Sequence, residues 1–291
     1  MRYRIAHRTE YAYGKTASLC HNEARLLPRD LPHQRCLGSE VAIEPVPAAY
    51  REREDFFGNR VSYFAIQQPH DRLTVTVTSE VRVEANPAQL DFSSDLPWER
   101  VRERLRAGTD PAALEARTYV LDSPLVTAGA ELADYAAPSF PPGRPLLAAV
   151  HDLMQRIHGE FTYDPDFTTV ATPLAKVLAH RRGVCQDFAQ LAIGCLRTMG
   201  LAARYDSGYI ETDPPPGGAR LTGADASHAW FSVYMPDGDW RGFDPTNNQV
   251  PMERHILTAW GRDFSDVTPL KGVIFGGGKH RLKVAVDVQR I

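Results

Sequence analysis

The sequence predicts an α+β fold, with an N-terminal β-sandwich followed by a region that mixes helices and strands. Three observations support this prediction: apolar and polar residues alternate with period two from Tyr3 to about Glu84, helical spacing dominates from Leu146 to Gly200, and alternation returns from Arg204 onward. We therefore expect three segments: a β-sandwich domain at 1–85, a linker and helical connection at 86–143, and a core domain at 144–291.

The N-terminal strands are predicted from strict alternation. Tyr3, Ile5 and His7 occupy every second position, and the Gly58-Asn59 turn leads into a further strand. The clearest apolar series has polar residues between its members: Leu73, Val75, Val77, Val81 and Val83. A run of strands without intervening helices is typical of a β-sandwich. We find no residue here that suggests catalytic chemistry.

The later elements follow in order along the chain. Residues 86–144 are charged and rich in proline, as expected for a connection. Apolar residues at helical spacing predict a helix from Leu146 to Ile157, and Thr172 with Pro173 marks the start of another. Strands are then expected at 204–211, in a hairpin around His228 and Trp240, at 255–260 and at 282–288.

Composition and net charge limit the class of protein. The chain has 291 residues, 43% of them hydrophobic, and a net charge of -3, which describes a soluble globular protein without the basic excess of a nucleic-acid binder. The first residues lack the apolar core of a signal peptide, and no later run is long enough to span a membrane, so we expect a cytoplasmic protein. Four cysteines show no Cys-x-x-Cys pair, so we expect no metal, no cofactor and no disulfides. The oligomeric state is not indicated.

Cys185 is the most informative residue, because it stands at the start of a predicted amphipathic helix that stops at Gly200. Gly183 allows a sharp turn into this helix, and the free amides and positive dipole end at its start favour thiolate over thiol. The position suits a nucleophile. The alternative is a small buried side chain, the usual role of a free cysteine and the one we expect for Cys195.

Two further residues could complete a site with this thiol. In the predicted hairpin His228 and Trp230 share one face, and Asp244 lies on the returning strand, where a bulge or a splayed strand end would let it reach the imidazole. His228 would then exchange a proton with Cys185, and Asp244 would orient the ring. Each has an ordinary alternative, since a strand histidine is often packed and an aspartate before proline often forms a turn.

Three sequence blocks carry a resemblance to a known family. They are Gly-Val-Cys-Gln-Asp-Phe-Ala at 183–189, Ser-His-Ala-Trp at 227–230 and Gly-Phe-Asp-Pro-Thr-Asn at 242–247. In their order and spacing the chain resembles the transglutaminase-like superfamily, and in particular the bacterial members described as cysteine proteases, which also have a β-rich N-terminal domain. The resemblance implies a papain-like core with Cys185, His228 and Asp244 as the catalytic triad.

The same resemblance implies a reaction at the amide bonds of a protein or peptide through a thioester acyl-enzyme. Hydrolysis by a protease or amidase is favoured over transamidation, and the alternative is a non-catalytic binding module that keeps the fold. Well-studied eukaryotic members depend on calcium, but Asp237-Gly238-Asp239 is better explained as a hairpin turn than as a calcium loop.

Supporting residues are less well defined. The backbone N–H of Cys185 is the first candidate donor to the oxyanion, and the second is either Tyr163, suggested by the resemblance, or the side chain of Gln186. Asp187 either supports the site or complements the helix dipole, and Trp230 could wall the cleft. A Pro- and Gly-rich stretch at 212–226 either borders the cleft, with Arg220 and Asp225 as polar contacts, or is an exposed spacer.

Overall fold

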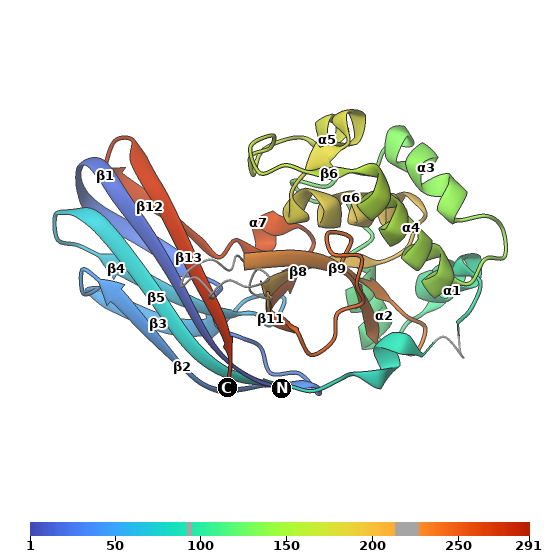
Figure 1. Cartoon of the computed structure of the whole chain (residues 1–291), viewed down its shortest axis with the longest axis horizontal. Helices are drawn as coiled ribbons and strands as arrows, with labels where there is room; N and C mark the ends of the chain where they lie inside the picture. Colours follow the sequence, from blue (N-terminus) through green and yellow to red (C-terminus); the bar gives the residue numbers. More distant parts are fainter. Residues whose placement is uncertain (92–94, 213–226) are drawn as a thin grey trace, which may run out of the picture.

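The computed structural model describes residues 1–91, 95–212 and 227–291, and it has the α+β architecture that the sequence predicts (Figure 1). The N-terminal strands are β1 (Arg2–Ala24), β2 (Gln34–Glu44), β3 (Ala49–Glu54), β4 (Arg60–Ile66) and β5 (His70–Val83). The middle of the chain contains η1 (Pro87–Leu90), α1 (Trp98–Ala107), α2 (Pro111–Arg117), α3 (Ala130–Ala136), η2 (Ala137–Ser139), α4 (Leu146–Glu160), β6 (Thr162–Tyr163), α5 (Leu174–His180), β7 (Arg182–Gly183) and α6 (Cys185–Thr198). The last part contains β8 (Ala203–Ile210), β9 (Ser227–Tyr234), β10 (Trp240–Phe243), β11 (His255–Gly261), α7 (Phe264–Val267), β12 (Leu270–Gly276) and β13 (His280–Arg290).

Strand β1 is the centre of the N-terminal sheet, because it has partners along both edges. β5 and β4 pair in succession with one edge, and β13 and β12 pair in succession with the other. β2 extends the sheet beyond β5, and β3 extends it beyond β4. The last two strands therefore complete this sheet, whereas the sequence analysis placed residues 270–290 in the core segment. Alternation predicts a strand but does not reveal its partner.

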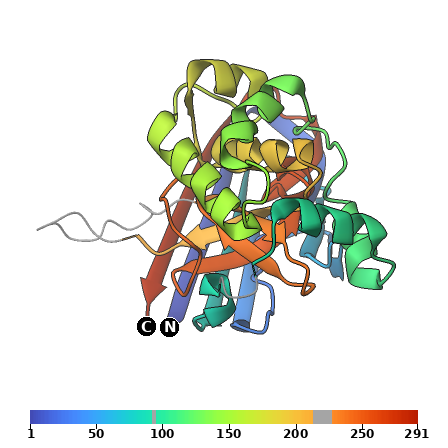
Figure 2. The same ribbon diagram turned by 90° about the vertical axis from the view of Figure 1, so that its right-hand side faces the viewer.

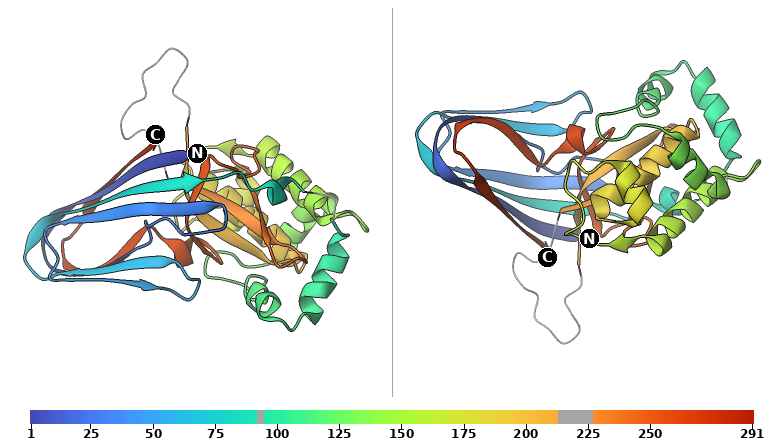
Figure 3. Two further views of the ribbon diagram at one scale, coloured as in Figure 1. Left: turned by 90° about the horizontal axis from the view of Figure 1, so that it is seen from below. Right: turned by 90° about the horizontal axis from the view of Figure 1, so that it is seen from above.

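One curled sheet supplies the apolar interior of the N-terminal part. Phe64 and Ile66 from β4 pack in the same cluster as Leu73 and Val75 from β5. A second cluster joins this sheet to the rest of the protein, since residues of β1 and β13 pack there against Tyr209 of β8 and Ile256 of β11. The N-terminal sheet and the core consequently lie side by side (Figure 3).

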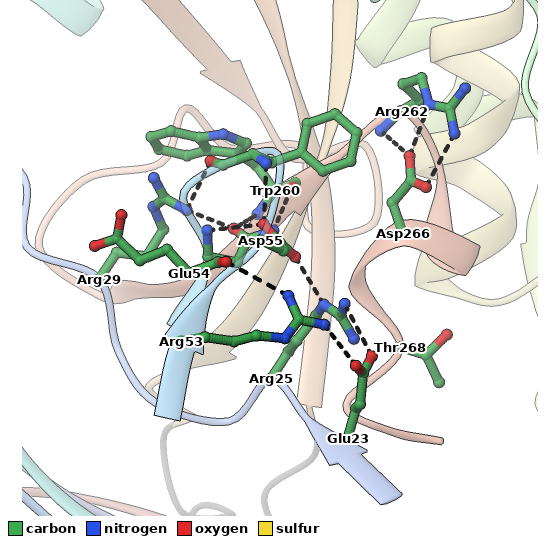
Figure 4. A network of polar contacts seen from close by, with 12 residues as sticks. Glu23, Arg25, Arg29, Arg53, Glu54, Asp55, Trp260, Arg262, Asp266 and Thr268 are labelled. Atoms are coloured by element: carbon green, nitrogen blue, oxygen red, sulfur yellow. Dashed lines mark hydrogen bonds and ion pairs between the residues drawn. The ribbon is translucent and has the colours of Figure 1, made fainter. Parts of the chain in front are cut away.

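A polar network reinforces the junction between the two parts (Figure 4). Arg25 donates through Nε to Asp55 Oδ2 at 2.9 Å. The Asn59 side chain donates to the carbonyl of Trp260 at 2.8 Å and accepts its N–H at 2.9 Å. The Arg29 guanidinium lies 3.5 Å from the centre of the Trp260 ring, a cation–π contact. The turn between β3 and β4 is thus held against β11.

The core is built on a second antiparallel sheet with the strand order β10-β9-β8-β11. Helix α6 packs on one face, where Ala229 and Phe231 of β9 share an apolar cluster with the buried face of the helix. Helices α3, α4 and α5 contact α6 in turn (Figure 2). The predicted amphipathic helix is confirmed, and it begins at Cys185. Within the described ranges, no helix is both long enough and apolar enough to cross a bilayer.

Candidate active site

Cys185 is the first residue of α6, and the local structure fixes that start. The Asp187 carboxylate accepts the N–H of Val184 at 2.8 Å and the hydroxyl of Thr168 at 2.6 Å. Burial raises the pKa of Asp187, and these two hydrogen bonds oppose the rise. A Cβ at Gly183 would lie 2.8 Å from the same carboxylate oxygen, so this position requires glycine. The structure therefore places Asp187 as a cap of the helix that carries the thiol.

The two cysteines of α6 differ in the way that the sequence suggested. Cys185 is partly exposed, whereas Cys195 is fully buried in the core cluster. Burial raises the pKa of the Cys195 thiol to about 12. Cys195 is a packing residue, and Cys185 is accessible from solvent.

His228 links the thiol to a carboxylate. Its Nε2 lies 2.7 Å from Asp244 Oδ2, and the ring is near enough to Cys185 for that thiol to contribute to the raised pKa of His228. Burial alone would lower the pKa of His228, but its hydrogen bonds to Asp244 and Cys185 and their charges raise it to about 10. The cationic form of the imidazole is thus favoured beside the Asp244 carboxylate.

Asp244 reaches His228 from the end of β10. The pairing of β10 with β9 is regular from Trp240 to Phe243, so the next pair would set Asp244 opposite Trp230. His228 is the diagonal neighbour on the same face, which the carboxylate reaches from just beyond the end of β10. Of the two expected irregularities, the pairing has no bulge, and Asp244 instead follows the strand end. Beyond this point the chain turns back through a bridge between Asp244 and Gln249.

The Asp244 carboxylate is fully buried and accepts five hydrogen bonds from the residues that the structure describes. Oδ2 accepts from His228, from Asn247 Nδ2 at 2.8 Å and from His255 Nε2 at 3.1 Å. Oδ1 accepts the backbone N–H of Thr246 at 3.0 Å and of Asn247 at 3.2 Å. Burial would raise the pKa of Asp244, but the bonds to the two histidines hold it well below its usual value. The group therefore remains a carboxylate.

Sequence reasoning missed two of these residues as parts of the site. Asn247 lies inside the third sequence block, so its position in the motif could have identified it. His255 was expected only as the first residue of a strand, and no local signal connects it with Asp244. Both side chains donate to the same oxygen as His228.

The remaining predicted residues surround the thiol and the histidine. Trp230 is buried, and its ring centre lies 6.0 Å from that of His228. Tyr163 is half exposed on β6, which pairs with β7 just before Cys185, and burial followed by the charge of Cys185 raises its pKa. Gln186 makes one long hydrogen bond, 3.5 Å from Nε2 to the Val170 carbonyl. Arg220 and Asp225 lie outside the described residues.

A cavity of about 470 Å³ opens on the sheet face that carries Trp230. Trp230, His255, Arg204 and Asp206 are among its lining residues, together with the loop at 31–34. Cys185 and His228 are not among them. The cavity is therefore separate from the thiol.

His228, Asp244 and His255 also form a set of metal-binding residue types, with ligand atoms within 4.8 Å of one another. Two imidazoles and a carboxylate are ligands of zinc and of iron. In this structure both Nε2 atoms face the carboxylate at hydrogen-bond distance, so each of them carries its proton toward Asp244. A metal would have to displace both protons.

The fold is that of an α+β protein in which a cysteine at a helix start, a strand histidine and a buried aspartate come together. Two family models match the chain: the bacterial transglutaminase-like N-terminal region over residues 3–82 and the transglutaminase-like superfamily over residues 135–245. An uncharacterised protein of Mycobacterium tuberculosis is 44% identical to this chain, covering 99% of it and 92% of the relative. A second, from Mycobacterium leprae, is 33% identical and covers 100% of this chain and 99% of the relative. The chain belongs to the transglutaminase-like superfamily.

The overall fold is also found in a solved structure. A protein of Cytophaga hutchinsonii, described as a candidate cysteine protease, superposes with a TM-score of 0.75 at 19% identity. The match covers 100% of this chain and 91% of that chain. At this level of identity the likeness establishes the shared fold.

Proposed function

We propose that the protein is a cysteine-dependent enzyme that cleaves amide or peptide bonds through a thioester on Cys185. The observation that carries this proposal is the position of His228, which lies 2.7 Å from the buried Asp244 and whose pKa is raised by both Asp244 and Cys185. A cationic imidazole beside a thiol favours the thiolate, which is the nucleophilic form.

The reaction would proceed in two steps. The Cys185 sulfur attacks the amide carbon, and the resulting tetrahedral intermediate expels the amine, which takes a proton from His228 and leaves a thioester. Water then attacks the thioester while His228 accepts one of its protons, and the C–S bond breaks to release a carboxylic acid. We place hydrolysis ahead of transamidation because water needs no binding site, whereas an amine must be bound to compete with it.

The oxyanion of the intermediate requires two donors. The Cys185 N–H lies in the first turn of α6, where backbone amides have no helical acceptor. For the second donor we favour Tyr163 over Gln186. The Gln186 amide is directed to Val170, whereas the Tyr163 hydroxyl has no hydrogen-bond partner among the residues that the structure describes.

The test is intact-mass analysis of a library of peptide amides after incubation with the enzyme, with and without a primary amine. Hydrolysed products that require Cys185, and that survive the Cys195→Ser control, would support the proposal. Amine-linked products in place of acids would change the reaction to transamidation. A library left intact by the wild-type protein, with no covalent thioester detected, would favour the non-catalytic binding module.

A further inference from the structure

His255 contacts Asp244 although the two residues belong to opposite edges of the core sheet. β10 and β11 form opposite edges of the four-stranded sheet, yet His255 at the start of β11 contacts the carboxylate that follows β10. Gly208 of β8 pairs with both His228 and Leu257, between the two histidine strands. A Cβ at Gly208 would lie 2.0 Å from the Ile256 carbonyl and 3.0 Å from the Trp230 ring, so the close packing there requires glycine.

We propose that His255 is a positioning residue for the active site, which fixes the Asp244 carboxylate in the orientation that His228 requires. The contact is 3.1 Å from Nε2 to Oδ2, the oxygen that also accepts from His228. This inference rests on the proposed function, because it assigns His255 a role in preparing the same thiol.

The protonation of the two rings differs in a way that fits this division of roles. A carboxylate only accepts hydrogen bonds, so the Nε2 of each ring must donate. Burial lowers the pKa of His255, and the charges of His228 and Arg254 lower it further, against the opposing effect of Asp244. His255 is therefore neutral with its single proton on Nε2, while His228 is cationic. Nδ1 of His255 is buried and has no hydrogen-bond partner among the described residues.

The ring plane of His255 is held by packing. Trp230 meets it edge to face, with ring centres 5.2 Å apart and an interplanar angle of 80°. A ring fixed by Trp230 and bonded to Oδ2 restricts rotation of the carboxylate, which in turn restricts rotation of His228. Asn247 and two backbone amides also hold Asp244, so loss of His255 should weaken the arrangement without abolishing it.

The test measures the rate at which iodoacetamide alkylates Cys185 as a function of pH, read by mass spectrometry of the Cys185 peptide. His255→Phe keeps a flat ring beside Trp230 but removes the donor. His255→Gln supplies a side-chain N–H at about the distance of Nε2 from the backbone. The loss of one hydrogen bond to a buried charge predicts that His255→Phe lowers the rate near pH 6 by about tenfold and moves the acid limb of the profile to higher pH. His255→Gln should restore most of the rate.

The control is His70→Phe, which removes another buried histidine whose two hydrogen-bond contacts, to Cys20 and to the Gln68 carbonyl, both lie within the N-terminal part. It should leave the profile unchanged. A wild-type profile in His255→Phe, or equal impairment of His255→Phe and His255→Gln, would overturn the inference. If His255→Phe does not fold, NMR spectra of wild-type protein with labelled histidine provide the test. Two low-field ring N–H signals are expected, one from His228 and one from His255. Absence of the His255 signal would overturn the inference.

Failure of the proposed function would give a different result. In that case wild-type Cys185 would react no faster than the partly exposed Cys36, and His228→Phe would leave the rate unchanged. If His228→Phe and Asp244→Asn slow alkylation but His255→Phe does not, only the role of His255 is refuted.

Discussion

Replacement of Asp244 by asparagine should destabilise the protein in a pH-dependent way. The carboxylate accepts five hydrogen bonds, three of them on Oδ2. The asparagine side chain has only one oxygen. If this oxygen accepts the two backbone N–H groups, the NH₂ group must face the three side-chain donors that Oδ2 accepted from. Removing one partner of a buried ion pair costs about 3–5 kcal/mol, and we expect Asp244→Asn to lower the free energy of unfolding by this amount at about pH 6.

The pH dependence follows from His228. Its folded pKa of about 10 lies above the ordinary 6.5, so the stability that its charge contributes is complete below 6.5 and is lost as the pH rises toward 10. Asp244 acts in the opposite sense, and because its pKa is depressed its contribution is lost only at acid pH, below the ordinary 3.8. The difference between wild type and Asp244→Asn should therefore shrink from about pH 6 to about pH 9.5.

Urea unfolding of both proteins at the two pH values measures this difference. Asp263→Asn is the matched control, because Asp263 is a fully buried carboxylate that accepts backbone N–H groups of Leu125 and Ser265 and has no hydrogen bond to a histidine in the described structure. Its effect on stability should be similar at both pH values. If the effect of Asp244→Asn is also constant, His228 is not a buried cation and the electrostatic account of the site is wrong.

Three further predictions concern the thiol and its surroundings. Near neutral pH, Cys185 should be alkylated much faster than the buried Cys195 and also faster than the partly exposed Cys36; equal rates for Cys185 and Cys36 in peptide mapping would argue against an activated thiol. Gly183→Ala should lower the free energy of unfolding by about 1–3 kcal/mol and slow Cys185 alkylation, because the new methyl group would overlap Asp187, whereas Gly159→Ala in open space on α4 should be neutral or slightly stabilising. Tyr163→Phe should lower kcat on a cleaved peptide by about a hundredfold with an unchanged unfolding midpoint, since the residue is half exposed; an unchanged kcat would leave Gln186 as the second donor.

Local patterns in the sequence were sufficient for the elements that hold Cys185, His228 and Trp230, but not for the short strand β6 that holds Tyr163. Helical spacing placed the start of a helix at Cys185, and alternation placed His228 and Trp230 on one face of a strand. The structure brings Cys185, His228 and Asp244 together, but their catalytic roles remain our proposal.

The features that sequence reasoning did not supply depend on contacts between distant segments. His255 meets Asp244 because the chain crosses from one edge of the core sheet to the other, and no periodicity encodes that crossing. The pairing of β12 and β13 with β1 is similar, since each strand shows its alternation but not its neighbour. For Asp187, the sequence showed its position in the first helical turn but not its hydrogen bond to Thr168, because that bond depends on the conformation of a loop.

The placement of β12 and β13 has a consequence for how the protein is made. On the ribosome β1 emerges before β12 and β13, and one of its edges stays unpaired until residues 270–290 have been made, so the N-terminal sheet cannot be completed before the core has been synthesised. Pairing across such a sequence separation is slow, and an unpaired strand edge invites association with other chains. A prematurely terminated polypeptide would keep this edge of β1 unpaired and exposed. Chaperones and proteases can recognise incomplete chains by such an edge.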